Sequence, residues 1–192
     1  SKREDVIVLP VIECTSDTVQ RGFPGCISIR YDVIASYLEN IFDEIRRNGI
    51  RKIVLLSFHG GNRYMIPVLQ RDLLEKGKDY VVFSPSFSMV KIPEELMEYV
   101  KYGGHAGVFE TSWLWYFYPD KVHPDKFKPG EMNEEVKFIS KFAKIDWSIK
   151  FPSGVDGDPT KASREIGKKL AEAFLDTINK FLDYVRDFDV NK

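Results

Sequence analysis

Two short stretches of the chain contain residue types that could do chemistry. The first, "LLSFHGGNRY" at residues 55–64, ends an apolar run in a histidine, two glycines and an asparagine. A histidine in this position can bind a metal or move a proton, and glycines let the backbone pass close to a ligand. Asn62 is expected to cap the helix that follows. The alternative is that the stretch is only a packed turn between a strand and a helix. His59 alone leaves both interpretations open.

The second stretch, "YGGHAGVFETS" at residues 102–112, strengthens the case for a site. It places His105 beside glycines and Glu110 five residues later, at the start of a predicted helix. Two imidazoles and a carboxylate at one edge of a sheet would form a partial site for a divalent ion such as zinc or manganese. The alternative is a glycine-rich turn in which Glu110 only complements the helix dipole. His123 has no comparable setting and is predicted to be an ordinary surface residue.

The apolar pattern around these stretches predicts alternating strands and helices. Continuous apolar runs predict strands over residues 6–12, 51–57 and 79–84. Helical spacing of apolar residues predicts helices over residues 31–48, 62–75 and 161–186. Such alternation is typical of an α/β fold with a mostly parallel sheet. Ligands of such sheets bind at the carboxyl ends of the strands, which is where His59 is expected.

Composition limits the classes of protein to which the chain could belong. With 192 residues, 43% of them hydrophobic, a single globular domain over residues 1–192 is expected. The net charge of -1 gives no reason to expect a nucleic acid or a membrane as a partner. Cys14 and Cys26 lack the spacing of a metal pair and are predicted to act as small apolar residues. No phosphate-binding loop is recognised, so nucleotide binding is not expected. A cytoplasmic location is expected because there is no signal-peptide core and the chain has only two thiols.

Several motifs in order resemble the creatininase (creatinine amidohydrolase) family. "FHGGN" followed by "GGHAGVFETS" carries the resemblance, and "RGFPGCISI" and "SGVDGDPTKASREIGKKL" are similar to the family's FPG and GDPT loops. The resemblance covers most of the chain. It implies a three-layer α/β/α fold, assembly into a homo-oligomer such as a hexamer, and hydrolysis of C–N bonds. It also implies two divalent metal ions per site, for which zinc, manganese and iron are all compatible with histidine and carboxylate ligands.

The resemblance also assigns roles to residues of this chain. His59 would be a metal ligand, His105 a catalytic or substrate-contacting histidine, and Glu110 a metal ligand or a carboxylate beside the ligands. Predicted substrate contacts flank these residues: Asn62, Gly104 and Thr111.

The chain also departs from the family's pattern. Creatininase itself has an acidic ligand where this chain has Gly61, so the sequence is closer to an "HGGN" branch that includes formamide hydrolases. The family's N-terminal strand and its "GSxEQHGPHLPLxTD" ligand segment have no match and are expected to be missing. Glu13 and Asp17 are carboxylates that could substitute, although no spacing rule selects either.

These observations predict a metal-dependent amidohydrolase that cleaves a C–N bond of a small cyclic amide or formamide. The alternative is a non-catalytic homologue that acts as a structural or ligand-binding subunit. A weaker alternative is an α/β domain in which "HGGN" holds an anion at a helix N-terminus.

Overall fold

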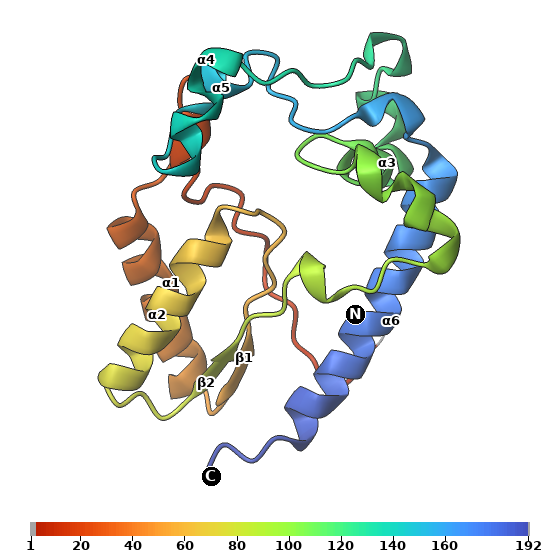
Figure 1. The fold of residues 1–192 in the computed structure, drawn as a ribbon. Helices are drawn as coiled ribbons and strands as arrows, with labels where there is room; N and C mark the ends of the chain where they lie inside the picture. Colours follow the sequence, from red (N-terminus) through yellow and green to blue (C-terminus); the bar gives the residue numbers. More distant parts are fainter. Residues whose placement is uncertain (1–2, 192) are drawn as a thin grey trace.

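A small parallel sheet with helices on both faces forms the centre of the structure (Figure 1). The computed structural model describes residues 3–191. Strands β1 (Lys52–Val54) and β2 (Val81–Phe83) pair in parallel, with Ile53 opposite Val82, and a further bridge joins Ser57 to Ser86. The connection between two parallel strands must cross over, and here the crossover contains a helix.

Helices α1 (Tyr31–Arg47) and α2 (Asn62–Glu75) cover one face of this sheet, and α6 (Arg164–Asp187) covers the other. The middle residue of each strand is buried against α1 and α2, together with the apolar stripe of α1 at Ile34, Leu38 and Phe42. On the opposite face, Phe83 packs edge-on against Phe181 of α6 and against Phe188, with ring centroids 6.4 and 5.4 Å apart. The predicted three-layer α/β/α fold is therefore confirmed.

The remaining helices lie between β2 and α6 along the chain, except for one 3-10 helix in the N-terminal loop before α1. They are α3 (Val108–Phe117), α4 (Glu134–Lys137) and α5 (Trp147–Lys150), with the 3-10 helices η1 (Thr18–Gln20), η2 (Phe87–Met89), η3 (Glu94–Tyr102), η4 (Pro119–Lys121), η5 (Pro124–Lys126), η6 (Ile139–Lys141) and η7 (Pro159–Lys161). None of the helices in residues 3–191 is long and apolar enough to cross a membrane.

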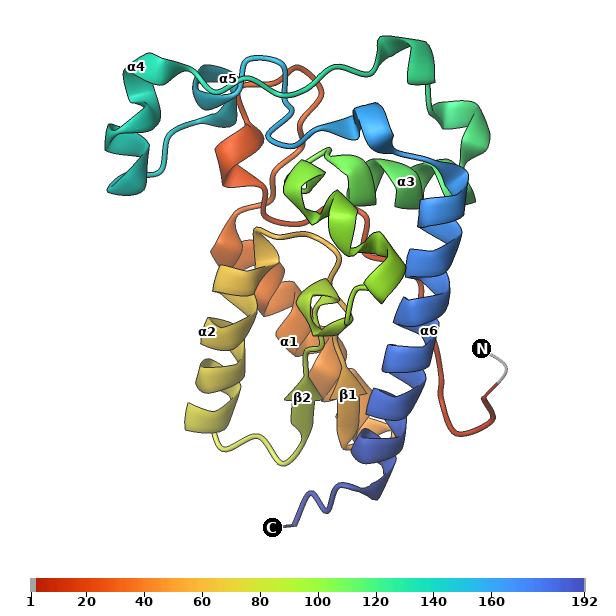
Figure 2. The ribbon, with the colours of Figure 1, turned by 45° about the vertical axis from the view of Figure 1, so that its right-hand side comes forward.

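Helix α3 packs directly on the first turns of α6 (Figure 2). A Cβ at Gly167 would lie only 2.0 Å from the carbonyl oxygen of Ser112, so the two backbones meet where Gly167 has no side chain. The Ser112 hydroxyl accepts a hydrogen bond of 3.0 Å from the backbone N–H of Ser163, which caps α6. Val108 and Leu170 are fully buried in the same contact. This contact fixes the N-terminus of α3, and with it the loop that carries His105.

The predicted helices are confirmed to within a few residues, and two of the predicted strands are confirmed in shorter form. The strand predicted over residues 6–12 is wrong. That segment is not paired into the described sheet, and Ile7, Val8 and Val11 are 74%, 70% and 84% exposed. Pro10 has no backbone N–H to donate to a ladder, and the sheet found in residues 3–191 consists of β1 and β2 without this segment.

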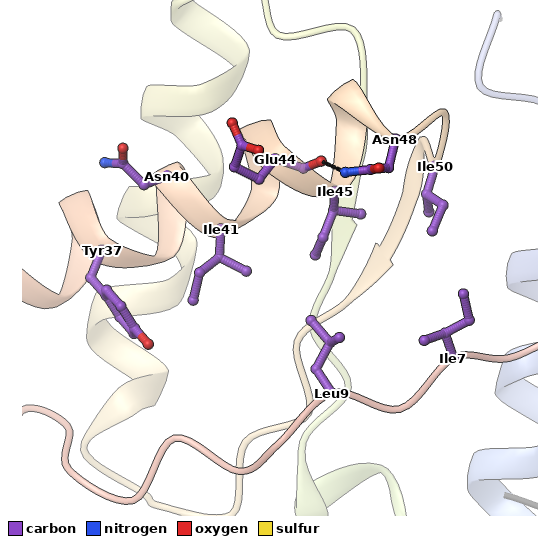
Figure 3. A pocket seen from close by; sticks show the side chains of 9 residues that line it. All are labelled: Ile7, Leu9, Tyr37, Asn40, Ile41, Glu44, Ile45, Asn48 and Ile50. Carbon is purple, nitrogen blue, oxygen red and sulfur yellow. Dashed lines mark hydrogen bonds between the residues drawn. The ribbon is translucent and has the colours of Figure 1, made fainter.

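The same N-terminal segment and helix α1 enclose an apolar groove instead (Figure 3). Its volume is about 490 Å³. Ile7 and Leu9 form one side, and Ile41 and Ile45 of α1 form the other. The apolar run is thus extended without being a strand: Ile7 and Leu9 line this groove, and both remain more than half exposed.

The packing of α3 on α6 should contribute strongly to stability. Leu170→Ala removes a side chain with no exposed surface and should lower the free energy of unfolding by about 2–5 kcal/mol. Leu175→Ala in the same helix, where the leucine is 56% exposed, should cost less than about 1 kcal/mol. Urea unfolding followed by circular dichroism measures both, and equal losses would contradict this description of the core.

Candidate functional site

The two histidine motifs lie in the connections that follow the two strands, at the carboxyl edge of the sheet. His59 lies between β1 and α2, and His105 lies between β2 and α3. A third segment, the loop that contains η1, touches both of them. Asp17 Oδ1 lies 3.8 Å from His59 Nε2, and Gln20 Nε2 lies 3.3 Å from His105 Nε2. The structure therefore brings the two motifs to opposite ends of one short loop.

Asn62 holds the backbone around His59 rather than capping the helix with its side chain. Helix α2 begins at Asn62 itself, Gly61 occupies the N-cap position, and no side chain caps the helix. The expected N-cap role of Asn62 is therefore wrong. Its side-chain amide donates to the hydroxyl of Ser57 at 3.1 Å, and its backbone N–H donates to the carbonyl of His59 at 3.1 Å. The residue is only 8% exposed, and its Oδ1 has no hydrogen-bond partner.

The His59 ring lies directly over Gly61. A Cβ at Gly61 would be 2.7 Å from His59 Cε1 and 3.5 Å from the carbonyl oxygen of Ser16. At Gly60, by contrast, no atom lies within 4 Å of the position that a Cβ would take. The two glycines of "HGGN" thus differ: the second is required by the position of the ring, and the first faces open space.

His105 is held at its backbone and at both ring nitrogens. Its carbonyl accepts hydrogen bonds of 3.0 Å from the N–H groups of Asp156 and Gly157. Its Nδ1 lies 3.5 Å from Glu110 Oε2, and Nε2 faces the amide of Gln20. Because an ionised carboxylate can only accept, the Nδ1 nitrogen carries the proton and Nε2 accepts from Gln20. The edge of the ring also packs on Trp147, with centroids 4.8 Å apart.

Glu110 and Thr111 hold the backbone of the His105 loop. Ala106 has a φ of 53°, a conformation that costs energy for a residue with a side chain. Its N–H donates to Glu110 Oε2 at 2.8 Å, and its carbonyl accepts from the Thr111 hydroxyl at 3.1 Å. Gly104 is exposed and lies against the backbone of Gly157. The predicted roles of Glu110 as a metal-site carboxylate and of Gly104 and Thr111 as substrate contacts stay predictions.

A second, more polar hollow lies beside this loop. Its volume is about 330 Å³, and Ala106, Thr111, Lys126 and Ser153 are among the residues that line it. A space of this volume can hold a small molecule. Thr111 lines it, so a ligand there would contact Thr111.

The described residues do not contain a ready-made cluster of metal ligands. Within residues 3–191, no group of three or more histidine, cysteine, aspartate or glutamate side chains is arranged to hold an ion. His59 instead pairs with Asp17, and Glu110 pairs with His105. The surroundings of His59 nevertheless suit a cation. Asp17 Oδ1 and Asn62 Oδ1 are buried acceptor oxygens without a hydrogen-bond partner, and both belong to residues that contact His59.

Cys26 lies beside Asp17 but is poorly suited to be a ligand. Its thiol faces the Asp17 carbonyl oxygen at 3.8 Å, and burial, followed by the charge of Asp17, raises the pKa of the Cys26 thiol. The thiol form is therefore favoured. Both Cys14 and Cys26 are free cysteines, and Cys14 is exposed rather than packed as a small apolar residue.

Sequence reasoning selected neither Asp17 nor Gln20 as a site residue. Asp17 is one of two carboxylates, with Glu13, between which no spacing rule distinguishes, and Gln20 belongs to no recognised ligand or catalytic motif. Both are placed by the fold of the loop that contains η1, where the Asp17 N–H donates to the Ser28 hydroxyl at 2.9 Å. Trp147 lies far along the chain and was missed for the same reason.

This arrangement defines an α/β protein with histidines at the carboxyl edge of a parallel sheet. The chain belongs to the creatininase family: the family described as "Creatininase: Creatinine amidohydrolase" matches residues 1–182. This confirms the resemblance expected from the motifs.

Two characterised relatives are similar in sequence. The 3-dehydro-scyllo-inosose hydrolase of Thermotoga maritima is 25% identical over 197 residues, which cover 89% of this chain and 62% of that protein. The creatinine amidohydrolase of Pseudomonas putida is 28% identical over 143 residues, which cover 66% of this chain and 55% of that protein. The chain thus spans less than two thirds of the length of either relative.

Solved structures show the same fold. A creatinine amidohydrolase structure from Bacteroides fragilis superposes with a TM-score of 0.77 at 24% identity, covering 92% of this chain and 70% of that one. A creatininase structure described as the Mn form gives a TM-score of 0.68 at 25% identity, covering 87% of this chain and 70% of that one. A mutant creatininase described as "Zn-Zn type" gives the same TM-score of 0.68.

The two glycines of "HGGN" should respond differently to the same substitution. Gly61→Ala should displace the His59 ring, because the new methyl group would occupy its position, whereas Gly60→Ala should leave the ring in place. The chemical shift of the His59 Hε1 proton measures this in each variant. A similar shift change in both variants would contradict the packing described for Gly61.

Proposed function

We propose that this chain carries the site of a metal-dependent amidohydrolase that cleaves a C–N bond of a small cyclic amide or formamide. The proposal rests on one observation. The two histidines lie in the connections at the same edge of the sheet, and the groups around each of them differ. His59 lies beside buried oxygens that lack partners, which suits a cation. His105 lies between a carboxylate and an amide, which suits proton transfer. Family membership and the names of the hydrolase relatives support the same activity.

His59 would hold a divalent ion through a ring nitrogen. A bound divalent ion supplies a Lewis acid and lowers the pKa of a water molecule toward about 7, so that hydroxide is available as the nucleophile. Zinc, manganese and iron all accept imidazole and carboxylate ligands. The descriptions of the Mn and Zn-Zn creatininase structures support this choice of metals. The proposal includes two ions per site, and the residues around His59 suggest the position of one.

His105 would move the proton that the leaving nitrogen requires. Its Nε2 accepts from Gln20 in this structure, so the same nitrogen can take up a proton when a substrate displaces the amide. Glu110, at 3.5 Å from Nδ1, would stabilise the imidazolium that results and keep the ring oriented. Trp147 would limit the rotation of the ring from its other side. The predicted contacts of Asn62, Gly104 and Thr111 with substrate belong to the same proposal, and the hollow that Thr111 lines supports the contact of Thr111 alone.

Metal content and turnover test this assignment of roles. His59→Ala should lose bound metal, whereas His105→Ala should keep the metal and lose about 10²–10⁴-fold in kcat, since only a proton-transfer group is removed. Metal per chain is measured by inductively coupled plasma mass spectrometry on protein purified without chelator. Turnover is measured as formation of the ring-opened product from creatinine and other cyclic amides, and as release of amine and formate from formamides. His123→Ala, at a surface histidine outside the site, is the matched control.

Three outcomes decide between the hypotheses. Full metal content in His59→Ala would overturn the ligand assignment. Bound metal without turnover of any substrate in the panel would favour the alternative, a non-catalytic homologue that acts as a structural or ligand-binding subunit. Binding of inorganic phosphate without metal would favour an anion site at "HGGN" instead.

We also propose that the chain assembles into a homo-oligomer through its N-terminal apolar side chains. Ile7, Val8 and Val11 expose large apolar side chains within one short segment, and clustered exposed apolar side chains are typical of an interface. Val11→Asp should therefore reduce the molar mass measured by light scattering after size-exclusion chromatography. Leu74→Asp, at a residue 79% exposed on α2, should not change it. A monomeric parent protein, or equal effects of both substitutions, would contradict the proposal.

A further inference from the structure

We infer that Asp17 is a second protein ligand of the divalent ion proposed at His59. The inference rests on the proposed function, because it assigns a further ligand to the same ion. It differs from the motif-based expectation, which assigned His59 and Glu110 as ligands and left Asp17 unselected.

The separation of the two side chains fits a shared ion better than a direct contact. Asp17 Oδ1 and His59 Nε2 are 3.8 Å apart. A direct hydrogen bond between an imidazole and a carboxylate would bring these atoms to about 2.7–3.2 Å. Two ligands of one tetrahedral zinc ion, each about 2.0–2.2 Å from it, lie about 3.3–3.6 Å apart. The observed distance of 3.8 Å is closer to this separation than to that of a direct hydrogen bond.

The bonding of Asp17 leaves one oxygen free for such an ion. The backbone of Asp17 is held on both sides, by the Ser28 hydroxyl at its N–H and by the Cys26 thiol at its carbonyl. Its Oδ2 lies 4.0 Å from the same thiol. Its Oδ1 is buried without a hydrogen-bond partner and faces His59. A buried carboxylate oxygen without a donor is costly unless a cation satisfies it.

Asn62, whose backbone N–H donates to the His59 carbonyl, gives an independent observation. The residue is only 8% exposed, its side-chain amide donates to the Ser57 hydroxyl, and its Oδ1 has no hydrogen-bond partner. Within residues 3–191, Asp17 and Asn62 are the two residues with a buried side-chain oxygen or nitrogen left without a hydrogen-bond partner. Both of these oxygens are acceptors, and a cation could satisfy either of them.

The packing at Gly61 explains why the carboxylate would come from another segment. Any side chain at position 61 would collide with the His59 ring, so "HGGN" cannot place a carboxylate beside its own histidine without moving it. The loop that contains η1 reaches the ring from the other side, since the Ser16 carbonyl lies 3.5 Å from the position of a Gly61 Cβ. Asp17 is the next residue of that loop.

The test compares two charge-neutralising substitutions in the same segment. Asp17→Asn should raise the dissociation constant for Zn²⁺ at least tenfold, because it removes a charged ligand. Glu13→Gln, at an exposed carboxylate four residues earlier, should leave it unchanged. Isothermal titration calorimetry on the full chain measures both constants. The ¹³C shift of the Asp17 carboxylate, recorded with and without Zn²⁺, should move by more than that of Glu13.

Each outcome has a distinct meaning. If the parent protein binds Zn²⁺, His59→Ala loses it and Asp17→Asn binds as tightly as the parent, the inference fails while the proposed function stands. An Asp17 carboxylate shift that does not respond to Zn²⁺ would likewise overturn it, even if the affinity fell through loss of structure. If the parent protein binds no divalent ion, the proposed function fails and the inference fails with it.

Discussion

The close contact between α3 and α6 is the constraint on which the second half of the structure depends. Gly167 lets the backbone of α6 approach the carbonyl of Ser112. The Ser112 hydroxyl in turn accepts a hydrogen bond from the N–H of Ser163, the N-cap residue of α6. Any side chain at position 167 would separate the two helices. Because α3 begins only three residues after His105, the position of that histidine follows from the packing of a helix pair rather than from the sheet itself. The sheet of two short strands could not position it alone.

The loop that contains η1 links this helix pair to the strand region. It contacts His59 through Asp17 and His105 through Gln20, and α5 covers it from outside, where Asp146 accepts from the N–H of Gly22 at 3.0 Å. The two histidines therefore do not need to touch each other to belong to one site. Movement of this loop would change the surroundings of both at once, which makes its order a condition for any reaction that uses both residues.

Much of the fold could be predicted from the sequence because its main elements are strongly periodic. The stripe of Ile34, Leu38 and Phe42 and the long apolar face of α6 have helical spacing that few other structures would satisfy. The run at residues 6–12 is predicted to be a strand because apolar runs usually mark burial, but such a run does not specify hydrogen bonding to a neighbouring strand. In the structure Ile7, Val8 and Val11 are instead largely exposed.

The site was predictable only in the parts that are continuous in the chain. His59 and His105 stand beside glycines in recognisable motifs, so their types and spacing drew attention to them. Asp17, Gln20 and Trp147 have ordinary sequence surroundings and reach the site only through tertiary folding. The role of Gly61 was also hidden, since a glycine that makes room for its own neighbour looks the same in sequence as one that faces solvent.

The His105 loop is held largely by main-chain atoms, and this has a consequence for how the family can diverge. The His105 carbonyl binds the N–H groups of Asp156 and Gly157, and a Cβ at Gly157 would lie 2.5 Å from the carbonyl oxygen of Gly103. Contacts of this kind depend on glycines and on backbone geometry, and they are indifferent to most other side chains. Mutations can therefore accumulate around the loop without displacing it. The fold as a whole is likewise retained in the Bacteroides fragilis structure, with a TM-score of 0.77 at 24% identity.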